Sequence, residues 1–312
     1  MNFQLLSFFS VVAIAGQAWC QAPWMENTPI VEVKRELYQS APRPGAAAYL
    51  SVADLGAGLQ LEQILTEEVR SDEFEKPRRR RSGDNGRTWS ALEPVTDHWA
   101  FPKDDFIWWA PSPSFYFYDP QTKVTLAMWL RQNLVGGRYY NHTFARLSKD
   151  LGLTWGEPTL LRYEGGDDFD PADPLKKSYL ESNIAYFGQK IIRHSNGTLI
   201  FAVSGVRIPR DAPDPNPQRI AVWDTPADSR NLGSLLFVGR WNAAAGDYDW
   251  TAGKPVWVPR HVSSRGLMEP DVAELNDGRV LVVWRCSNAG IDPAREPGRK
   301  RFSVSSDGGL TL

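Results

Sequence analysis

The sequence predicts an all-β protein, and its aromatic content, its turn residues and a repeated octapeptide carry this prediction. The 312 residues include 13 Trp, 10 Tyr and 14 Phe, and aromatic side chains favour strands over helices. The 25 Gly and 23 Pro interrupt the chain too often for long helices, so we expect many short strands joined by tight turns. With 42% hydrophobic residues the chain can bury a large core.

The charge balance and the N-terminus indicate the class of partner and the location. A formal net charge of −2 argues against nucleic acid as the main partner. The apolar block from Leu5 to Ala15 has no acidic residue and is too short for a transmembrane span. We therefore predict a possible signal peptide over residues 1–20, no transmembrane span, and a secreted, periplasmic or cell-surface protein.

One octapeptide pattern occurs three times, at residues 82–89, 148–155 and 305–312. The pattern is Ser-x-Asp-x-Gly-x-Thr-Trp, and the third copy has Leu312 in place of Trp. Asp, Ser and Thr side chains bond the backbone of a tight turn, Gly supplies a positive φ, and the aromatic ring anchors the turn. We therefore interpret Asp84, Asp150 and Asp307 as structural residues and not as catalytic ones.

Further strands fill the sequence between these octapeptides. Runs of β-branched and aromatic residues alternate with turn signals, of which the tripeptide Ser195-Asn196-Gly197 is one. The predicted strands are residues 114–119, 124–130, 186–193, 198–203 and 235–241.

Two charged segments are interpreted as solvated. The run from Arg78 to Arg81 abuts the first octapeptide and is expected at a solvated strand end. The loop over residues 164–177 carries a cluster of aspartates, whose oxygens would suit calcium. Their spacing does not match an EF-hand loop, so an acidic solvated loop is the favoured interpretation. The aspartates are Asp167, Asp168, Asp170 and Asp173.

Residues 269–285 combine a lone acid, a hairpin turn and an arginine at the end of a strand. The sequence Asn276-Asp277-Gly278 is a strong tight-turn signal, and the run after it is rich in β-branched residues. An antiparallel hairpin closed at this turn brings Glu269 and Arg285 to the same edge. On local grounds, the pair is either an ordinary surface ion pair or part of a pocket.

The octapeptides resemble the Asp boxes, or BNR repeats, of sialidase-like proteins, in which each box forms the turn between outer strands of a propeller blade. Residues 269–285 resemble the sialidase segment in which a glutamate precedes a Glu-Leu-x-Asp-Gly hairpin and an arginine ends the returning strand. The resemblance implies a six-bladed β-propeller of the sialidase type over residues 21–312. It also implies that the propeller is incomplete at its C-terminal end.

The resemblance implies an exported exo-glycosidase that releases terminal sialic acid or a related acidic sugar with retention, using a tyrosine nucleophile. Glu269 would take the phenolic proton, and Arg285 would bind the substrate carboxylate. Asp72 is the candidate acid/base, with Glu73 or Glu75 as alternatives. Arg43 is the nearest counterpart of the first family arginine, although it lacks the Arg-Ile-Pro context. The tyrosine and the third arginine would follow the third Asp box.

No cofactor or metal is implied, and the expected partner is a glycan or glycoconjugate substrate. One alternative is a non-catalytic propeller that binds carbohydrate or protein. Another is a propeller glycosidase that cuts a different sugar with a pair of carboxylates. For the binding alternative, aromatic side chains in loops would stack on sugar rings. The candidates for this role are Trp99, Trp108, Trp109, Tyr139 and Tyr140.

Overall fold

The computed structural model describes residues 37–56, 60–70, 73–95, 107–110, 116–135, 138–217, 230–287 and 298–312. The chain divides into two units, Met1–Ala41 and Pro42–Leu312, and every element named below belongs to the second. The described part is all-β, with one short helix, α2 (Lys177–Leu180), which confirms the predicted fold class. None of its helices is long and apolar enough to cross a bilayer. The predicted signal peptide lies outside the described residues.

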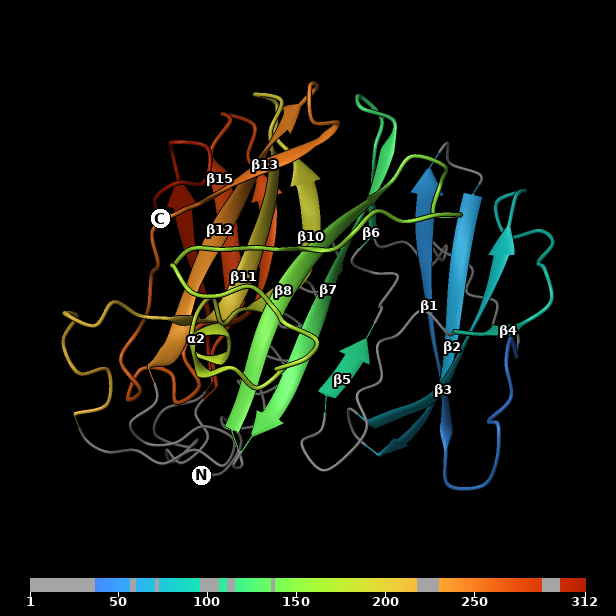
Figure 1. Cartoon of the computed structure of the whole chain (residues 1–312), viewed down its shortest axis with the longest axis horizontal. Coiled ribbons are helices and arrows are strands. Elements are labelled where there is room, and N and C mark those ends of the chain that lie inside the picture. The colour runs from blue at the N-terminus through green and yellow to red at the C-terminus, as the bar shows by residue number, and fades with distance from the viewer. Residues whose placement is uncertain are drawn as a thin grey trace, which may run out of the picture. The chain divides into compact units, whose positions relative to one another are not determined.

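The strands form antiparallel sheets in which the chain passes from one strand to a neighbouring one (Figure 1). The first sheet contains β1 (Ala47–Gly56), β2 (Gln60–Arg70), β3 (Glu73–Ser82) and β4 (Glu93–Pro94). In the second sheet β5 (Ile107–Ala110) and β6 (Tyr116–Asp119) both pair with β7 (Val124–Val135), which is followed by β8 (Arg138–Ser148) and β9 (Thr159–Leu160). The third contains β10 (Tyr186–Arg193), β11 (Leu199–Arg207), β12 (Asn231–Asn242) and β13 (Asp247–Ala252). The fourth contains β14 (Met268–Glu274), β15 (Val280–Arg285) and β16 (Lys300–Ser305).

The five strands predicted between the octapeptides are present as β6, β7, β10, β11 and β12. The arginine run lies at the end of a strand, β3, as predicted, but residues 78–81 are partly buried and not solvated. Arg81 pairs at 2.9 Å with Glu62, whose side chain is only 2% exposed. The Arg80 guanidinium lies 5.0 Å from the centre of the Trp89 ring. Arg81 and Arg80 therefore contact protein side chains on the adjoining strand and turn, where the sequence predicted contact with solvent.

The third sheet is buried on both faces by its neighbours. Along β11, Leu199, Phe201 and Val203 join an apolar cluster with side chains of the second sheet. The alternate residues Ile200 and Ala202 join another cluster with side chains of the fourth sheet. A strand covered on both faces favours apolar side chains at successive positions, which explains the uninterrupted apolar run over residues 199–203 of β11.

The Asp-box octapeptides close their turns with the same side-chain bonds. Asp84 accepts a 2.8 Å bond from the Thr88 N–H and a 2.6 Å bond from the Thr88 hydroxyl, and the Ser82 hydroxyl donates to it at 2.8 Å. Asp150 and Asp307 accept equivalent bonds in the other two octapeptides. The three carboxylates are thus engaged in holding their turns.

The pKa values of these aspartates determine how low pH affects the stability of the fold. Bonds led by those from Thr88 and Thr154 lower the pKa of Asp84 and Asp150 from 3.8 to about 2. Burial opposes the shift at Asp307, but the bonds still lower its pKa to about 2. A carboxyl group whose pKa is lower in the folded state than in the unfolded state stabilises the fold at pH values above its unfolded-state pKa. This contribution is lost as the pH falls through the folded-state pKa.

We expect the melting temperature to fall as the pH drops from about 4 to about 2. An Asp150→Asn variant should melt earlier than the unmodified protein at neutral pH, and its melting temperature should depend less on pH over this interval. Thermal melts across the interval measure both quantities. An identical pH dependence in the variant would contradict the role given to the carboxylate.

Two of the Asp boxes also connect neighbouring sheets. A Cβ atom at Gly152, in the second box, would lie 3.3 Å from Leu55 of the first sheet, and Arg81 donates a hydrogen bond to the Gly152 carbonyl. In the third box the Leu310 carbonyl accepts a 2.8 Å bond from the N–H of Lys254, just after β13 of the third sheet. Each of these turns therefore packs on the sheet that precedes its own.

A buried carboxylate connects the second and third sheets. Asp119, fully buried at the end of β6, accepts bonds from Arg193 of β10 and from the Tyr248 hydroxyl of β13. The Thr122 hydroxyl adds a bond of 2.6 Å. Burial opposes ionisation, but the bonds from Thr122, Tyr248 and Arg193 outweigh it and lower the pKa of Asp119. The charged carboxylate thus joins the second sheet to the third.

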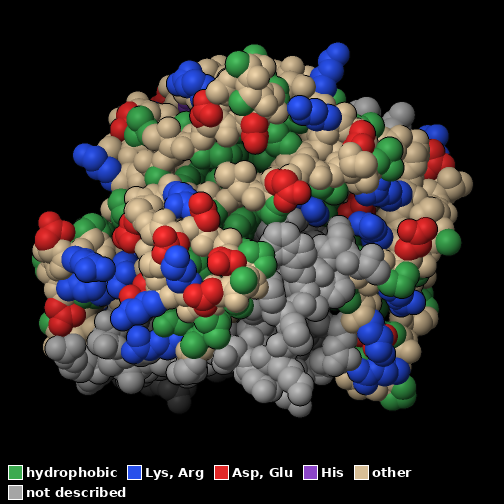
Figure 2. Space-filling model, viewed as in Figure 1, with side chains coloured by type: hydrophobic (Ala, Val, Ile, Leu, Met, Phe, Trp, Pro, Cys, Tyr) green, Lys and Arg blue, Asp and Glu red, His purple; other side chains and the backbone are tan. Residues whose placement is uncertain are grey.

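Acidic and basic side chains are mixed over the face seen in Figure 2 and form no single patch of one sign there. In the acidic loop, Asp168 pairs with Arg162, and Asp167 pairs with Lys176 at 3.0 Å. Among the described residues no three His, Cys, Asp or Glu side chains come together as a metal site would require. Basic side chains therefore meet two of the aspartates that were considered as calcium ligands.

Candidate functional site

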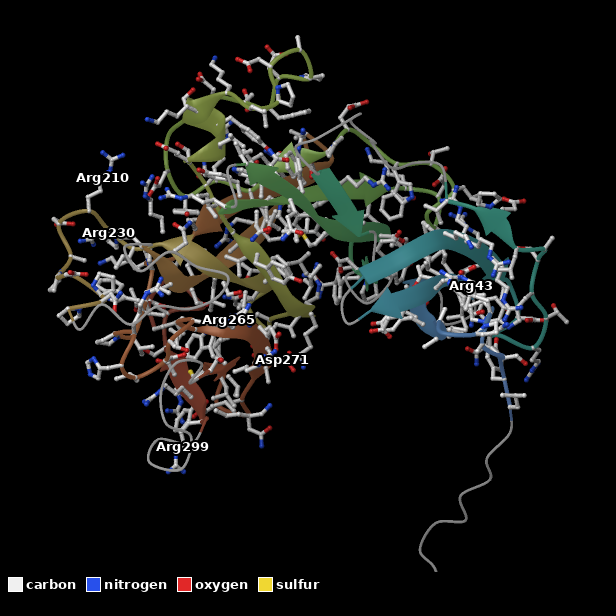
Figure 3. The ribbon with its side chains drawn as sticks, turned by 90° about the horizontal axis from the view of Figure 1, so that it is seen from below. Arg43, Arg210, Arg230, Arg265, Asp271 and Arg299 are labelled. Carbon is white, nitrogen blue, oxygen red and sulfur yellow. The ribbon has the colours of Figure 1, made fainter. Side chains whose placement is uncertain are left out.

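Residues 269–285 form the hairpin of β14 and β15, as predicted. Figure 3 shows this hairpin from below, with Asp271 marking β14. Gly278 has a φ of +80° in the turn, where only glycine is unstrained. The Arg285 Nη1 atom donates to Glu269 Oε1 at 2.6 Å, and the two side chains are 52% and 35% exposed. The expected proximity of the acid and the arginine is therefore present.

Glu269 is held in an unusual backbone conformation. Its φ is +47°, a value that residues other than glycine rarely adopt. The pairing register of β14 against β15 shifts between Met268 and Asp271, so that Glu269 lies in a bulge. Met268 is directly opposite Arg285, and in a regular strand the next residue would point to the other face of the sheet. The bulge allows Glu269 to reach Arg285.

A glycine on the neighbouring sheet supports this bulge. A Cβ atom at Gly188 of β10 would lie 2.7 Å from the Pro270 carbonyl oxygen and 2.5 Å from that of Ala202. Real Cβ atoms do not approach so closely, so only glycine lets β10 pack against the bulge. Bulges and strained backbone concentrate at functional sites, where they orient a side chain. The geometry marks Glu269 as a candidate functional residue independently of its sequence context.

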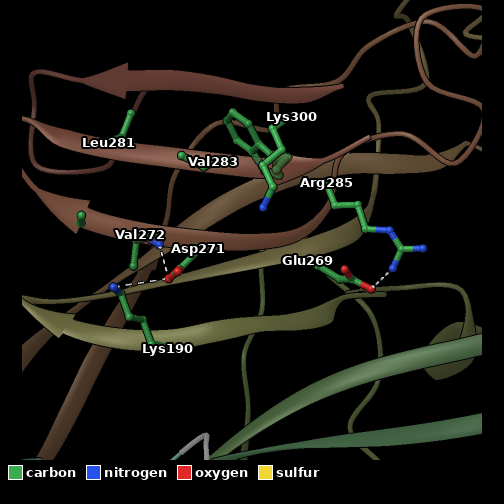
Figure 4. A pocket seen from close by; sticks show the side chains of 10 residues that line it. Lys190, Glu269, Asp271, Val272, Leu281, Val283, Arg285 and Lys300 are labelled. Atoms are coloured by element: carbon green, nitrogen blue, oxygen red, sulfur yellow. Dashed lines mark hydrogen bonds and ion pairs between the residues drawn. The ribbon is translucent and has the colours of Figure 1, made fainter. Parts of the chain in front are cut away.

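The ion pair borders a hollow of about 520 Å³ on the fourth sheet (Figure 4). Its floor includes Leu281 and Val283 of β15. Lys190 of β10 pairs with Asp271 at 3.5 Å inside it. The charged side chains that line the hollow are Lys190, Glu269, Asp271, Arg285 and Lys300. A hollow of this size with an apolar floor and several polar groups suits a ligand as small as a monosaccharide.

Of Arg43 and Asp72, only Arg43 is described, and it does not lie with this pair. Arg43 lies beside the first sheet (Figure 3), where its Nε atom donates to Glu67 at 3.1 Å. Lys76 also pairs with Glu67 at 3.2 Å, and the Lys76 bond, together with that from Arg43, lowers the pKa of Glu67. Asp72 lies outside the described residues.

The aromatic residues considered for sugar stacking are spread over different segments. Trp108 and Trp109 belong to β5, and Tyr139 and Tyr140 belong to β8. Trp99 lies outside the described residues. Of the five side chains, only that of Tyr140 is described, and it does not line the hollow.

Three charged residues of the hollow were not predicted from the sequence. They are Lys190, Asp271 and Lys300. Lys300 is the first residue of β16. This strand ends at the first Ser of an Asp box, and β3 and β8 end at the first Ser of the other two boxes. That regularity would have predicted β16. Lys190 reaches the hollow through the packing of β10 against β14, which no local pattern encodes.

Comparison with known proteins gives weak similarities only. No family model and no curated protein matches the chain. Among solved structures, the NanB sialidase of Streptococcus pneumoniae superposes with a TM-score of 0.45 and 12% identity over 88% of this chain. The intramolecular trans-sialidase of Ruminococcus gnavus gives 0.42 and 12% over 84%, and the GH93 alpha-L-arabinofuranosidase of Fusarium graminearum gives 0.40 and 14% over 86%.

The chain corresponds to only part of these proteins. The aligned region covers 52% of the NanB sialidase chain, 68% of the trans-sialidase chain and 65% of the arabinofuranosidase chain. At such TM-scores and identities, the similarities by themselves support neither a fold family nor an activity.

Proposed function

We propose that this protein is a glycosidase of the sialidase type that releases a terminal sialic acid or a related acidic sugar with retention. The observation that carries the proposal is the Glu269–Arg285 pair, which a strained bulge holds at 2.6 Å on the border of a sugar-sized hollow. An ordinary surface ion pair needs neither the bulge nor the positive φ. The match of residues 269–285 to the sialidase pattern supports the same assignment.

The two side chains have complementary tasks on this proposal. Sialic acid carries a carboxylate at its anomeric carbon, so an anionic nucleophile would be repelled where a neutral phenol would not. Glu269 takes the proton of that phenol as it attacks. Arg285 binds the substrate carboxylate, and its five N–H donors allow it to do so while one of them holds Glu269.

We propose a six-bladed propeller as the fold that carries this site, with the four sheets as successive blades. Three observations support the blade assignment. Each sheet is an antiparallel meander, the third sheet shares apolar clusters with the second and the fourth, and the Asp boxes lie at the end of the third main strand of a sheet. On this proposal, the tyrosine nucleophile and the third arginine belong to blades beyond the fourth sheet.

Asp72 and Arg43 complete the proposed site as acid/base and as a second ligand of the substrate carboxylate. Asp72 owes its role to its place in the sequence, twelve residues before Asp84 of the first Asp box. Arg43 precedes β1 and would have to exchange its bond with Glu67 for one with the substrate.

The test is hydrolysis of fluorogenic glycosides by the complete gene product. We expect release of the fluorophore from an N-acetylneuraminic acid glycoside and none from the galactoside, because only the first offers Arg285 a carboxylate. Cleavage of the neutral glycoside alone would favour a glycosidase for another sugar. Binding of the acidic glycoside without cleavage would favour the non-catalytic alternative, and either result would refute the proposal.

A further inference from the structure

The bulge that carries Glu269 lies against a second bulge in the neighbouring sheet. In β14, Glu269 and Pro270 together lie opposite a single residue of β15. In β10, the three residues from Gly188 to Lys190 lie opposite a single residue of β11. The two irregular segments meet, because Gly188 lies against Pro270 and Lys190 reaches Asp271.

The conformation of Glu269 has to be held by its surroundings. Its φ of +47° is unfavourable for a residue with a side chain, and such a conformation persists only where neighbouring structure fixes it. The groups that fix it have to contact the bulge of β14. Gly188 and Lys190, both in the bulge of β10, make contacts of two different kinds with it.

The contact at Gly188 is steric. Gly188 is buried, and a Cβ atom at this position would lie 2.7 Å from the Pro270 carbonyl oxygen and 3.2 Å from the Pro270 Cγ atom. Any side chain here would push β14 away from β10. Because Pro270 directly follows Glu269, a displacement of Pro270 also moves the backbone of Glu269. The glycine therefore sets how closely the two bulges approach.

The contact at Lys190 is electrostatic. Its Nζ atom lies 3.5 Å from the Asp271 Oδ1 atom, and the same oxygen accepts a 2.9 Å bond from the Val272 N–H (Figure 4). Asp271 is the residue at which β14 resumes its pairing with β15 after the bulge. A half-exposed ion pair adds little to the stability of the whole fold. Its effect is local, because it fixes the end of the bulge to β10.

We propose that Gly188 and Lys190 are positioning residues for Glu269, which hold the bulge of β14 against β10 and so fix the place of the Glu269 carboxylate. This inference rests on the proposed function for the role of Glu269 as a base. A reacting group has to be held within about 0.5 Å of its productive place, and a displacement of about 1 Å can lower the rate about 10²-fold. Neither residue has to contact the reacting atoms.

The test compares the complete gene product with its Gly188→Ala, Lys190→Met and Lys190→Arg variants, by crystal structures and by steady-state kinetics on the acidic fluorogenic glycoside. Gly253→Ala and Lys176→Met are the matched controls. A Cβ atom at Gly253, just after β13, would lie 2.6 Å from a backbone carbonyl oxygen. Lys176, just before α2, forms an ion pair at 3.0 Å with an exposure similar to that of the Lys190 pair.

In Gly188→Ala we expect the φ of Glu269 to leave the positive range, its carboxylate to move by more than about 1 Å, and kcat to fall about 10²-fold. Lys190→Met should move the carboxylate less and lower kcat about tenfold, and Lys190→Arg should restore both. KM should stay within about twofold in all three variants, because Arg285 still binds the substrate carboxylate. The two controls should keep their kcat, whatever they lose in melting temperature.

An unmoved Glu269 in the variants, or equal losses of kcat in the controls, would overturn the inference. If Gly188→Ala does not fold, the Lys190 variants decide. The crystal structures separate this inference from the proposed function, because they need no substrate. If no glycoside is cleaved but Glu269 moves in the variants, the proposed activity is wrong and the positioning role stands. If the acidic glycoside is cleaved and neither Glu269 nor kcat changes in the variants, the activity stands and the positioning role is wrong.

Discussion

Glu269→Gln is expected to lower kcat of the complete gene product on an acidic fluorogenic glycoside by about 10²- to 10⁴-fold, the usual contribution of a general base. The amide keeps an oxygen that can accept the Arg285 bond but cannot take a proton from the nucleophile. Glu269 is 35% exposed, so loss of its charge should change the melting temperature little. Steady-state kinetics and a thermal melt on the same preparation measure both effects.

Glu274→Gln is the matched control, because Glu274 is also an acid of β14 but does not line the hollow. A bond from the Ser195 hydroxyl, together with the 2.9 Å bond from the Ser195 N–H, lowers the pKa of its carboxyl group. The control should therefore lose some stability and keep its kcat. If Glu269→Gln retained full activity, or lost activity only together with a large fall in melting temperature, Glu269 would be a structural residue.

Asp119→Ala is expected to destabilise the protein by about 3–5 kcal/mol, the usual cost of removing one partner of a buried ion pair. The substitution leaves the Arg193 guanidinium, which is only 14% exposed, without its carboxylate, and it removes the acceptor of the Tyr248 hydroxyl. For a unit of this size the melting temperature should fall by about 10 °C. Chemical denaturation and thermal melts give the two values.

Two further variants make the Asp119 result specific. Asp249→Ala removes an exposed carboxylate of β13 and should change stability by less than about 0.5 kcal/mol. The double variant Asp119→Ala with Arg193→Met removes both charges and should recover part of the loss, because no buried charge is left uncompensated. Equal effects of Asp119→Ala and Asp249→Ala would show that the network does not hold the sheets together.

The parts of the structure that sequence analysis predicted are those set by local chemistry. In an Asp box the donors and acceptors lie within four residues, so the turn at Asp84 follows from its own octapeptide. The β14–β15 hairpin follows in the same way from its turn residues. The hairpin brings residues 268 and 285 opposite one another, and the bulge then turns Glu269 toward Arg285.

The parts that were missed depend on residues far apart in the chain. Asp119 is 74 residues from Arg193 and 129 from Tyr248, and none of the three carries a recognisable pattern. The bulge at Glu269 depends on Gly188, which reads in sequence as one glycine inside a strand. Such contacts are settled only when whole sheets pack on one another.

Packing of the second and third Asp boxes on the sheet before their own gives assembly a direction. The box at Gly152 needs Leu55 and Arg81 of the first sheet as its docking surface, and the box at Leu310 needs the segment just after β13 of the third. In each case the surface that receives the turn is translated before the turn itself. Because the chain leaves the ribosome N-terminus first, the preceding sheet has already been synthesised when each of these two turns docks on it. These sheets can therefore be added in chain order during synthesis.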